Sequence, residues 1–128
     1  MLRSTSSERF KTDIEDIEPE YSSKIYEMRP VFYRSLSSAD NPDHGYWGLI
    51  AEEVAEIDPR LVQWGYLEED YEEVEMQDSE GETVIIKKLK DDAVRRPLGV
   101  QYDRLSVLLL KELQIMKTDI QAALLSQV

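Results

Sequence analysis

The sequence predicts an α+β fold in which a small globular helix-strand unit carries a β-hairpin insertion and a long C-terminal helix that forms a trimeric coiled coil. Three observations lead to this prediction. Helix and strand patterns alternate between turn residues over residues 20–57, residues 68–92 have the pattern of two strands around a turn, and apolar residues recur every three or four positions from residue 102 onward. A chain of 128 residues has room for one such core.

Periodicity and stop signals define the first unit. Tyr21, Ile25 and Met28 share one helical face, and the Arg29-Pro30 step ends that helix because the residue before a proline avoids the helical region. Residues 12–15 have the form of a capping box and predict a short helical turn or strand before it. The elements expected next are a helix over residues 20–28, a strand over 31–34, a loop over 35–45, a strand over 46–50 and a helix over 51–57.

Residues 68–92 change abruptly from acidic to basic. Residues 68–73 are nearly all acidic, residues 78–81 have turn composition, and residues 83–88 combine β-branched side chains with two lysines. We interpret the acidic run as the solvated edge of a hairpin and not as a cation site, because its carboxylates lack the spacing of a calcium loop. This hairpin is the expected insertion.

The C-terminal segment is the most periodic part of the chain. One stripe, with steps of four and three, has the pattern of a coiled-coil seam: Leu109, Leu113, Met116, Ile120 and Ala123. A second stripe consists of Leu105, Leu108, Ile115 and Ala122. Because one helix face cannot hold both stripes, we expect the helix to pack on its own domain and on other copies, and a broad apolar surface favours more than two strands. The alternative is a long helix buried within one monomer.

Composition excludes several classes of protein. The chain has no cysteine and one histidine, His44, so a disulfide framework, a thiolate metal site and a histidine-built metal centre are not expected. A net charge of -12 argues against nucleic acid or an anionic membrane as the main partner. No apolar run approaches the roughly 20 residues that span a bilayer, and no signal peptide is recognisable. We expect a cytoplasmic protein or a fragment of a longer chain.

Residues 6–11, with the sequence SSERFK, contain the candidate catalytic pair. The hydroxyl of Ser6 and the amine of Lys11 have the chemistry of a nucleophile and its base. A lysine serves as a base only where burial or a nearby cation disfavours its charge, and Arg9 would supply that cation or position an oxyanion. Five residues separate the pair by about 140 degrees on a helix and place it on opposite faces of a strand. The segment must therefore bend, or a neighbouring chain must complete the pair; alternatively, Ser6 is a helix N-cap and Lys11 a solvated charge.

The order of several motifs resembles the Peptidase S74 domain, the C-terminal intramolecular chaperone of bacteriophage tail spikes and tail fibres of the endosialidase type. The family opens with Ser-Asp-x-Arg-x-Lys and an acidic and aliphatic stretch, matched here by Ser6, Arg9, Lys11, Asp13 and Ile14, with Ser7 in place of the aspartate. The family's GFIAQEV corresponds to GLIAEEV at residues 48–54. The remaining matches are MRPVFY at residues 28–33, Pro59-x-Leu61-Val62 and Val100-x-Tyr102-x-x-Leu105.

The resemblance implies a homotrimer that guides folding of the upstream fibre or spike domain of the same chain, in the host cytoplasm during virion assembly, and is released from the mature fibre. It would cut the Thr5-Ser6 bond, with Ser6 as nucleophile, Lys11 as base and Arg9 in support, without a cofactor. Residues 1–5 would then be a fibre remnant or cloning residues, and residues 6–128 the domain, with 101–127 as the coiled-coil helix.

Two other functions are compatible with parts of the sequence. The first is a trimerisation or capping module of a fibre protein without catalysis. The second is a free-standing acidic adaptor, which leaves the heptads and the serine-lysine spacing unexplained. We also expect residues 48–54, with Tyr46 and Trp47, to form the core and part of the contact with the nascent fibre, while Trp47 as a plain core residue fits the sequence equally well.

Overall fold

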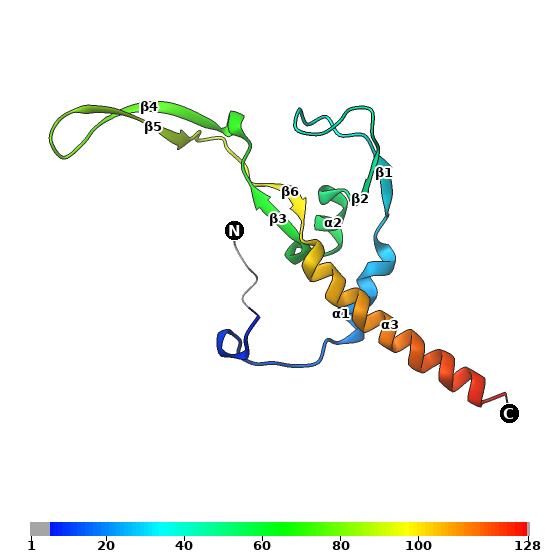
Figure 1. Ribbon diagram of the computed structural model, residues 1–128. Coiled ribbons are helices and arrows are strands. Elements are labelled where there is room, and N and C mark those ends of the chain that lie inside the picture. Colours follow the sequence, from blue (N-terminus) through cyan, green and yellow to red (C-terminus); the bar gives the residue numbers. More distant parts are fainter. Residues whose placement is uncertain (1–5, 128) are drawn as a thin grey trace.

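The computed structural model describes residues 6–127, and the chain forms three antiparallel two-stranded sheets and a long C-terminal helix (Figure 1). The first sheet pairs β1 (Val31–Tyr33) with β2 (Tyr46–Gly48), and the second pairs β3 (Val62–Gly65) with β6 (Arg96–Val100). The third is the hairpin of β4 (Tyr71–Gln77) and β5 (Thr83–Leu89). The mixed α+β class, the hairpin and the long C-terminal helix are confirmed, whereas the sequence patterns gave no sign of the β3–β6 sheet.

The core is small and lies where four elements meet. Among residues 6–127, the buried apolar side chains are Val54 of α2 (Ala51–Ile57), Leu61 of η3 (Pro59–Leu61), Val62 of β3 and Leu105 of α3 (Tyr102–Leu125). Partly buried side chains surround them: Ile25, Met28, Leu49, Ala55, Val100 and Leu108. Ile25 and Met28 belong to the predicted helical face and pack against the core, whereas the third residue of that face, Tyr21, is exposed at 41%.

The segment before the first sheet differs from the prediction. Residues 12–18 have no regular secondary structure, so the capping-box prediction for residues 12–15 is wrong. Asp13 has φ 53°, a left-handed conformation that interrupts a helix at that point. Helical structure begins at α1 (Pro19–Ser22), where proline suits the first position, and continues as the 3-10 helix η2 (Ser23–Glu27).

The β4–β5 hairpin explains the change from acidic to basic sequence. Its register places Glu72 opposite Lys88 and Glu73 opposite Lys87, so the two runs are cross-strand partners. A turn closes the hairpin, with Gly81 at φ 81° and Asp78 accepting hydrogen bonds from the backbone of Glu80 and Glu82. At the base, η4 (Glu68–Asp70) contributes a buried Asp70 carboxylate that accepts a hydrogen bond from the amide of Leu67 at 2.8 Å.

Helix α3 extends well beyond the core. Figure 1 shows that it leaves the body on the side opposite the hairpin. Its second stripe is covered only in part, with Leu105 buried and Leu108 and Ile115 half-buried, whereas every residue from Met116 to Gln127, including Ala122 of that stripe, is exposed. No helix in residues 6–127 is long and apolar enough to cross a membrane.

Candidate active site

A short turn brings Ser6 and Lys11 together. The 3-10 helix η1 (Glu8–Phe10) lies between two extended residues, Ser7 at ψ 143° and Lys11 at ψ 150°. Because this turn reverses the chain direction, Lys11 Nζ reaches Ser6 Oγ and donates a hydrogen bond at 3.2 Å. Of the two routes that the spacing allowed, the described chain adopts the bend within one chain.

Ser7 holds the turn at its first residue. Its Oγ accepts a hydrogen bond from the amide of Arg9 at 3.4 Å, and the amides of Phe10 and Lys11 bond to the carbonyls of Ser7 and Glu8, both at 3.0 Å. Serine and aspartate are comparably good residues at a helix N-cap. The N-cap is therefore Ser7 and not Ser6, so the hydroxyl of Ser6 remains free for other chemistry.

The turn is open to solvent in the single chain. All residues from Ser6 to Ile14 are exposed, including the apolar side chains of Phe10 at 65% and Ile14 at 66%. Within residues 6–127 the guanidinium of Arg9 forms no ion pair with a carboxylate, so it is not tied down by an acid of the described chain. Thr5, on the other side of the candidate scissile bond, lies outside the described residues.

The other motifs hold the core together. Arg29 of MRPVFY binds Glu53 of GLIAEEV through two hydrogen bonds, Nε to Oε1 at 3.1 Å and Nη2 to Oε2 at 2.7 Å. This ion pair lowers the pKa of Glu53, chiefly through the hydrogen bond from Arg29. The pair links the segment before β1 to α2 and is partly exposed, so its role is positional.

A second contact joins GLIAEEV to the start of α3. The amide of Leu49 donates a hydrogen bond to the hydroxyl of Tyr102 at 2.9 Å. A Cβ atom at Gly48 would lie 2.9 Å from that same hydroxyl, so the glycine leaves room for the tyrosine. Two motifs more than fifty residues apart thus form one contact.

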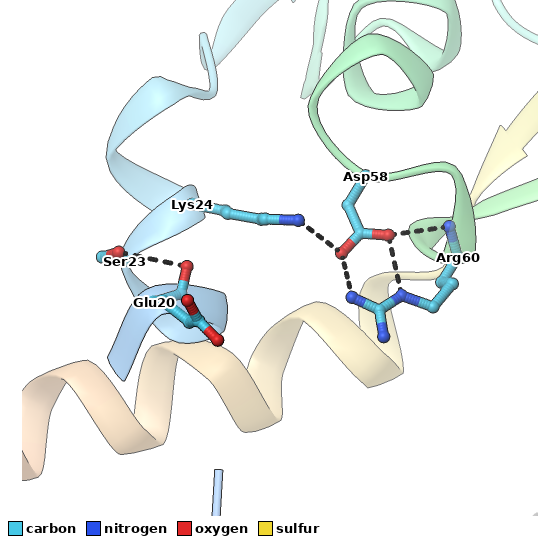
Figure 2. Close-up of polar contacts among 5 residues, drawn as sticks. All are labelled: Glu20, Ser23, Lys24, Asp58 and Arg60. Atoms are coloured by element: carbon cyan, nitrogen blue, oxygen red, sulfur yellow. Dashed lines mark hydrogen bonds and ion pairs between the residues drawn. The ribbon is translucent and has the colours of Figure 1, made fainter. Parts of the chain in front are cut away.

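Asp58 contacts both Lys24 and Arg60, as Figure 2 shows. Its buried carboxylate accepts hydrogen bonds from Arg60 Nε at 3.0 Å, Arg60 Nη2 at 2.8 Å and Lys24 Nζ at 3.2 Å. These bonds, above all the one from the Arg60 side chain, hold the pKa of Asp58 well below its usual range. Lys24 belongs to η2, so the carboxylate ties the first helical segment to the turn after α2.

The comparison with known families agrees with this order of motifs. A family model described as Peptidase S74, chaperone of endosialidase, matches residues 6–63. Residues 6–63 are therefore similar to the Peptidase S74 family. The match begins at Ser6 and ends in β3, so it spans the Ser6–Lys11 turn, the β1–β2 sheet and α2. A search of curated proteins finds no match.

Sequence reasoning missed a buried polar contact between α1 and α3. Ser22 of α1 is fully buried and donates a hydrogen bond from Oγ to Glu112 Oε2 of α3 at 2.6 Å. The pKa of Tyr26 is raised, first by desolvation and then by the charge of Glu112. A glutamate among the apolar residues of a helix was the available signal, but only the fold shows which serine it meets.

One expectation about the β1–β2 sheet is wrong. Trp47 is 85% exposed, so it is not a core residue, and its cross-strand partner Phe32 is also exposed at 59%. Tyr46 points to the opposite face and is half-buried. The alternation of a two-stranded sheet places neighbouring residues on opposite faces, which separates Trp47 from Tyr46.

Proposed function

We propose that the chain is the C-terminal intramolecular chaperone of a phage tail spike or fibre, that it trimerises through α3, and that it releases itself by cutting the Thr5-Ser6 bond. The contact between Ser6 Oγ and Lys11 Nζ at 3.2 Å carries the catalytic part of this proposal. The match of residues 6–63 to the S74 family model supports the chaperone part.

The chemistry uses the serine's own position in the chain. Attack of Ser6 Oγ on the carbonyl carbon of Thr5 closes a five-membered ring, while the Oγ proton passes to the amine of Lys11. The Thr5-Ser6 C–N bond then breaks, Lys11 returns the proton to the departing α-amine, and an ester remains. Water hydrolyses this ester, giving a carboxyl group on Thr5 and restoring the hydroxyl of Ser6.

The exposure of the turn links cutting to assembly. General-base action by a lysine needs burial or a nearby cation. Because Ser6 and Lys11 are exposed in the single chain, the assembled trimer would supply the missing cover, and the exposed side chains of Phe10 and Ile14 are suited to being covered. Arg9 would supply the cation or hold the oxyanion of the tetrahedral adduct.

The surface of the single chain favours assembly. Its accessible area is 11067 Å², whereas a compact monomer of this mass exposes about 7,000 Å². The proposed seam residues of α3 are exposed, with Leu109 at 45%, Leu113 at 63%, Met116 at 46% and Ile120 at 55%. Ala123 completes the seam, and Leu110 and Leu124 extend its apolar surface on one side. Within the described residues, the last turns of α3 are exposed throughout, and so short a helical extension is marginal in water without packing.

A non-catalytic trimerisation or capping module is the second candidate. It would use the same α3 seam, and the contacts among the core motifs would serve only to hold the fold. The two candidates differ at Ser6 alone, so one experiment separates them.

The experiment expresses this chain behind a trimeric fibre segment with Thr5-Ser6 intact. We expect a released fragment that begins at Ser6, detected on a gel and by mass spectrometry. Ser6→Ala removes the nucleophile and Lys11→Arg keeps the charge but cannot act as a base, so both variants should stay full length and still assemble.

Ser7→Asp is the matched control, because it changes the neighbouring residue yet keeps an N-cap acceptor for the turn. It should still be cut. If the parent chain forms well-folded trimers but stays uncut, the peptidase hypothesis is excluded and the capping module remains.

A further inference from the structure

Helix α3 places two opposite charges on either side of the proposed seam. With Leu113 and Ile120 at position a of the heptad and Leu109 and Met116 at position d, Glu112 falls at position g and Lys117 at position e. These positions flank the a/d seam and contact the neighbouring helix. Lys117 is exposed, whereas Glu112 is only 6% exposed and lies where the seam meets α1.

Glu112 has acceptor capacity beyond its contact with Ser22. The hydrogen bond from Ser22 engages Oε2 and the hydroxyl of Tyr26 also bonds to the carboxylate, while an ionised carboxylate offers about four acceptor sites on its two oxygens. In the described chain no lysine or arginine forms an ion pair with Glu112. A carboxylate so little exposed is stabilised by a cation brought next to it.

We propose that Lys117 of a second copy pairs with Glu112, and that this contact fixes the parallel orientation and the register of the assembled helices. In a parallel coiled coil, residue g of one helix lies beside residue e of the next heptad on its neighbour, which is five positions later. This spacing separates Glu112 from Lys117. The proposal rests on the self-association of α3 proposed above and names the residues that determine its geometry.

The same charges disfavour the antiparallel alternative. If Leu113 packed against Met116 of an antiparallel copy, position g would face position g, and Glu112 would lie near Asp119 of that copy. Two carboxylates beside a poorly solvated site repel each other. A parallel shift of one heptad would replace Lys117 with Leu110 or Leu124, so only one parallel register forms the ion pair.

Cysteine pairs test the geometry directly, because the parent chain contains no cysteine. In the Glu112→Cys, Lys117→Cys double variant, the two residues of one helix are separated by a rise of about 7.5 Å, beyond the reach of a disulfide. Mild oxidation should therefore link separate chains into dimers and trimers on a non-reducing gel. The Glu112→Cys, Asp119→Cys variant reports the antiparallel arrangement and should stay unlinked.

Charge variants of the full chain test the ion pair itself. Lys117→Glu should raise the concentration at which half of the chains are assembled by roughly tenfold, measured by light scattering. Lys90→Glu is the matched control, since it changes the net charge equally at an exposed residue outside α3, and it should have little effect. Linking of the 112/119 pair, or equal effects of the two charge variants in a chain that assembles, would overturn the inference. A monomeric parent chain would instead remove the assembly proposal and this inference with it.

Discussion

Gly48 is a single residue on which the contact between Leu49 and Tyr102 of α3 depends. The hydroxyl of Tyr102 occupies the space beside it and accepts a hydrogen bond from the amide of Leu49. A side chain at this residue must displace either that hydroxyl or the ring of Tyr33, which a Cβ atom would meet at 3.3 Å. The core motif therefore needs glycine for space and not for an unusual backbone angle.

Gly48→Ala should lower the free energy of unfolding by about 1–3 kcal/mol, because the added methyl group overpacks a filled site. Urea unfolding followed by circular dichroism measures the change. The double variant Gly48→Ala, Tyr102→Phe removes the hydroxyl that the methyl group meets. Its cost should be clearly less than the sum of the two single costs; strict additivity would show that the two residues do not compete for this space.

Asp58 makes stability depend on pH in the acid range. Its pKa is lowered in the folded state, so below the ordinary pKa of about 3.9 the unfolded chain binds a proton that the folded chain does not. The stabilisation is fully present above that pH and is lost as the pH falls toward the lowered pKa. Asp58→Asn should lower the free energy of unfolding by about 2 kcal/mol at pH 7. It should also make this free energy depend less on pH in the acid range.

Glu53→Gln is the control for Asp58, because it also breaks a carboxylate-arginine contact but at a partly exposed site. It should cost less than about 1 kcal/mol at pH 7. Thermal unfolding between pH 2 and 7 compares the two variants. If Asp58→Asn lost stability at acid pH just as the parent chain does, Asp58 would not be the source of the pH dependence.

At the scale of elements, α3 divides its two apolar stripes between two partners. Leu105, Leu108 and Ile115 pack on the domain, while the seam stripe remains exposed. The domain-facing stripe contributes to folding of the single chain, and the seam stripe to the proposed assembly. Substitutions on the two stripes should therefore have different consequences.

Leu113→Asp and Ile120→Asp should each give folded monomers, because the seam would have to bury an unpaired charge while the domain face of α3 is unchanged. Light scattering well above micromolar concentration measures the mass, and circular dichroism checks the fold. Val94→Asp replaces another exposed apolar residue, in the connection between β5 and β6, and should leave the assembly intact. A monomeric parent chain under these conditions would rule out the seam.

At the scale of the whole molecule, the hairpin and α3 project from opposite sides of a small core (Figure 1). Such a shape buries little surface within one chain and leaves its apolar side chains to neighbours. Three chains of net charge -12 repel one another, so apolar burial must outweigh a repulsion that salt screens. Tethering three fibre chains through this domain would raise their effective concentration for one another.

A fibre expressed without residues 6–128 should aggregate or remain monomeric, whereas a fibre folded with the domain and then freed of it should survive heating as a trimer. The physical reason is that the tether speeds assembly, while slow unfolding preserves the product after release. Gel electrophoresis with and without prior heating distinguishes the two. A truncated fibre that reaches the same heat-resistant trimer unaided would refute the chaperone function, whatever happens at Ser6.

The sequence by itself determined the elements whose signals are local. Helix α2 spans residues 51–57 as predicted, since its end follows from Asp58-Pro59, and the hairpin turn lies at the predicted glycine because only certain residues suit such turns. The two stripes of α3 were readable because a helix repeats every 3.6 residues. The identity of Ser6 and Lys11 as a candidate pair also came from their residue types and their motif.

Only the tertiary structure decided how these parts meet. The β3–β6 sheet joins strands on either side of the hairpin, and the partner of Glu112 is Ser22, ninety residues away in the chain. Local periodicity states that a face is apolar but not what will cover it, which is why Trp47 proved to be exposed and Leu105 buried. The approach of Lys11 to Ser6 likewise required the turn capped by Ser7, because neither an extended strand nor a continuous helix brings side chains five residues apart together.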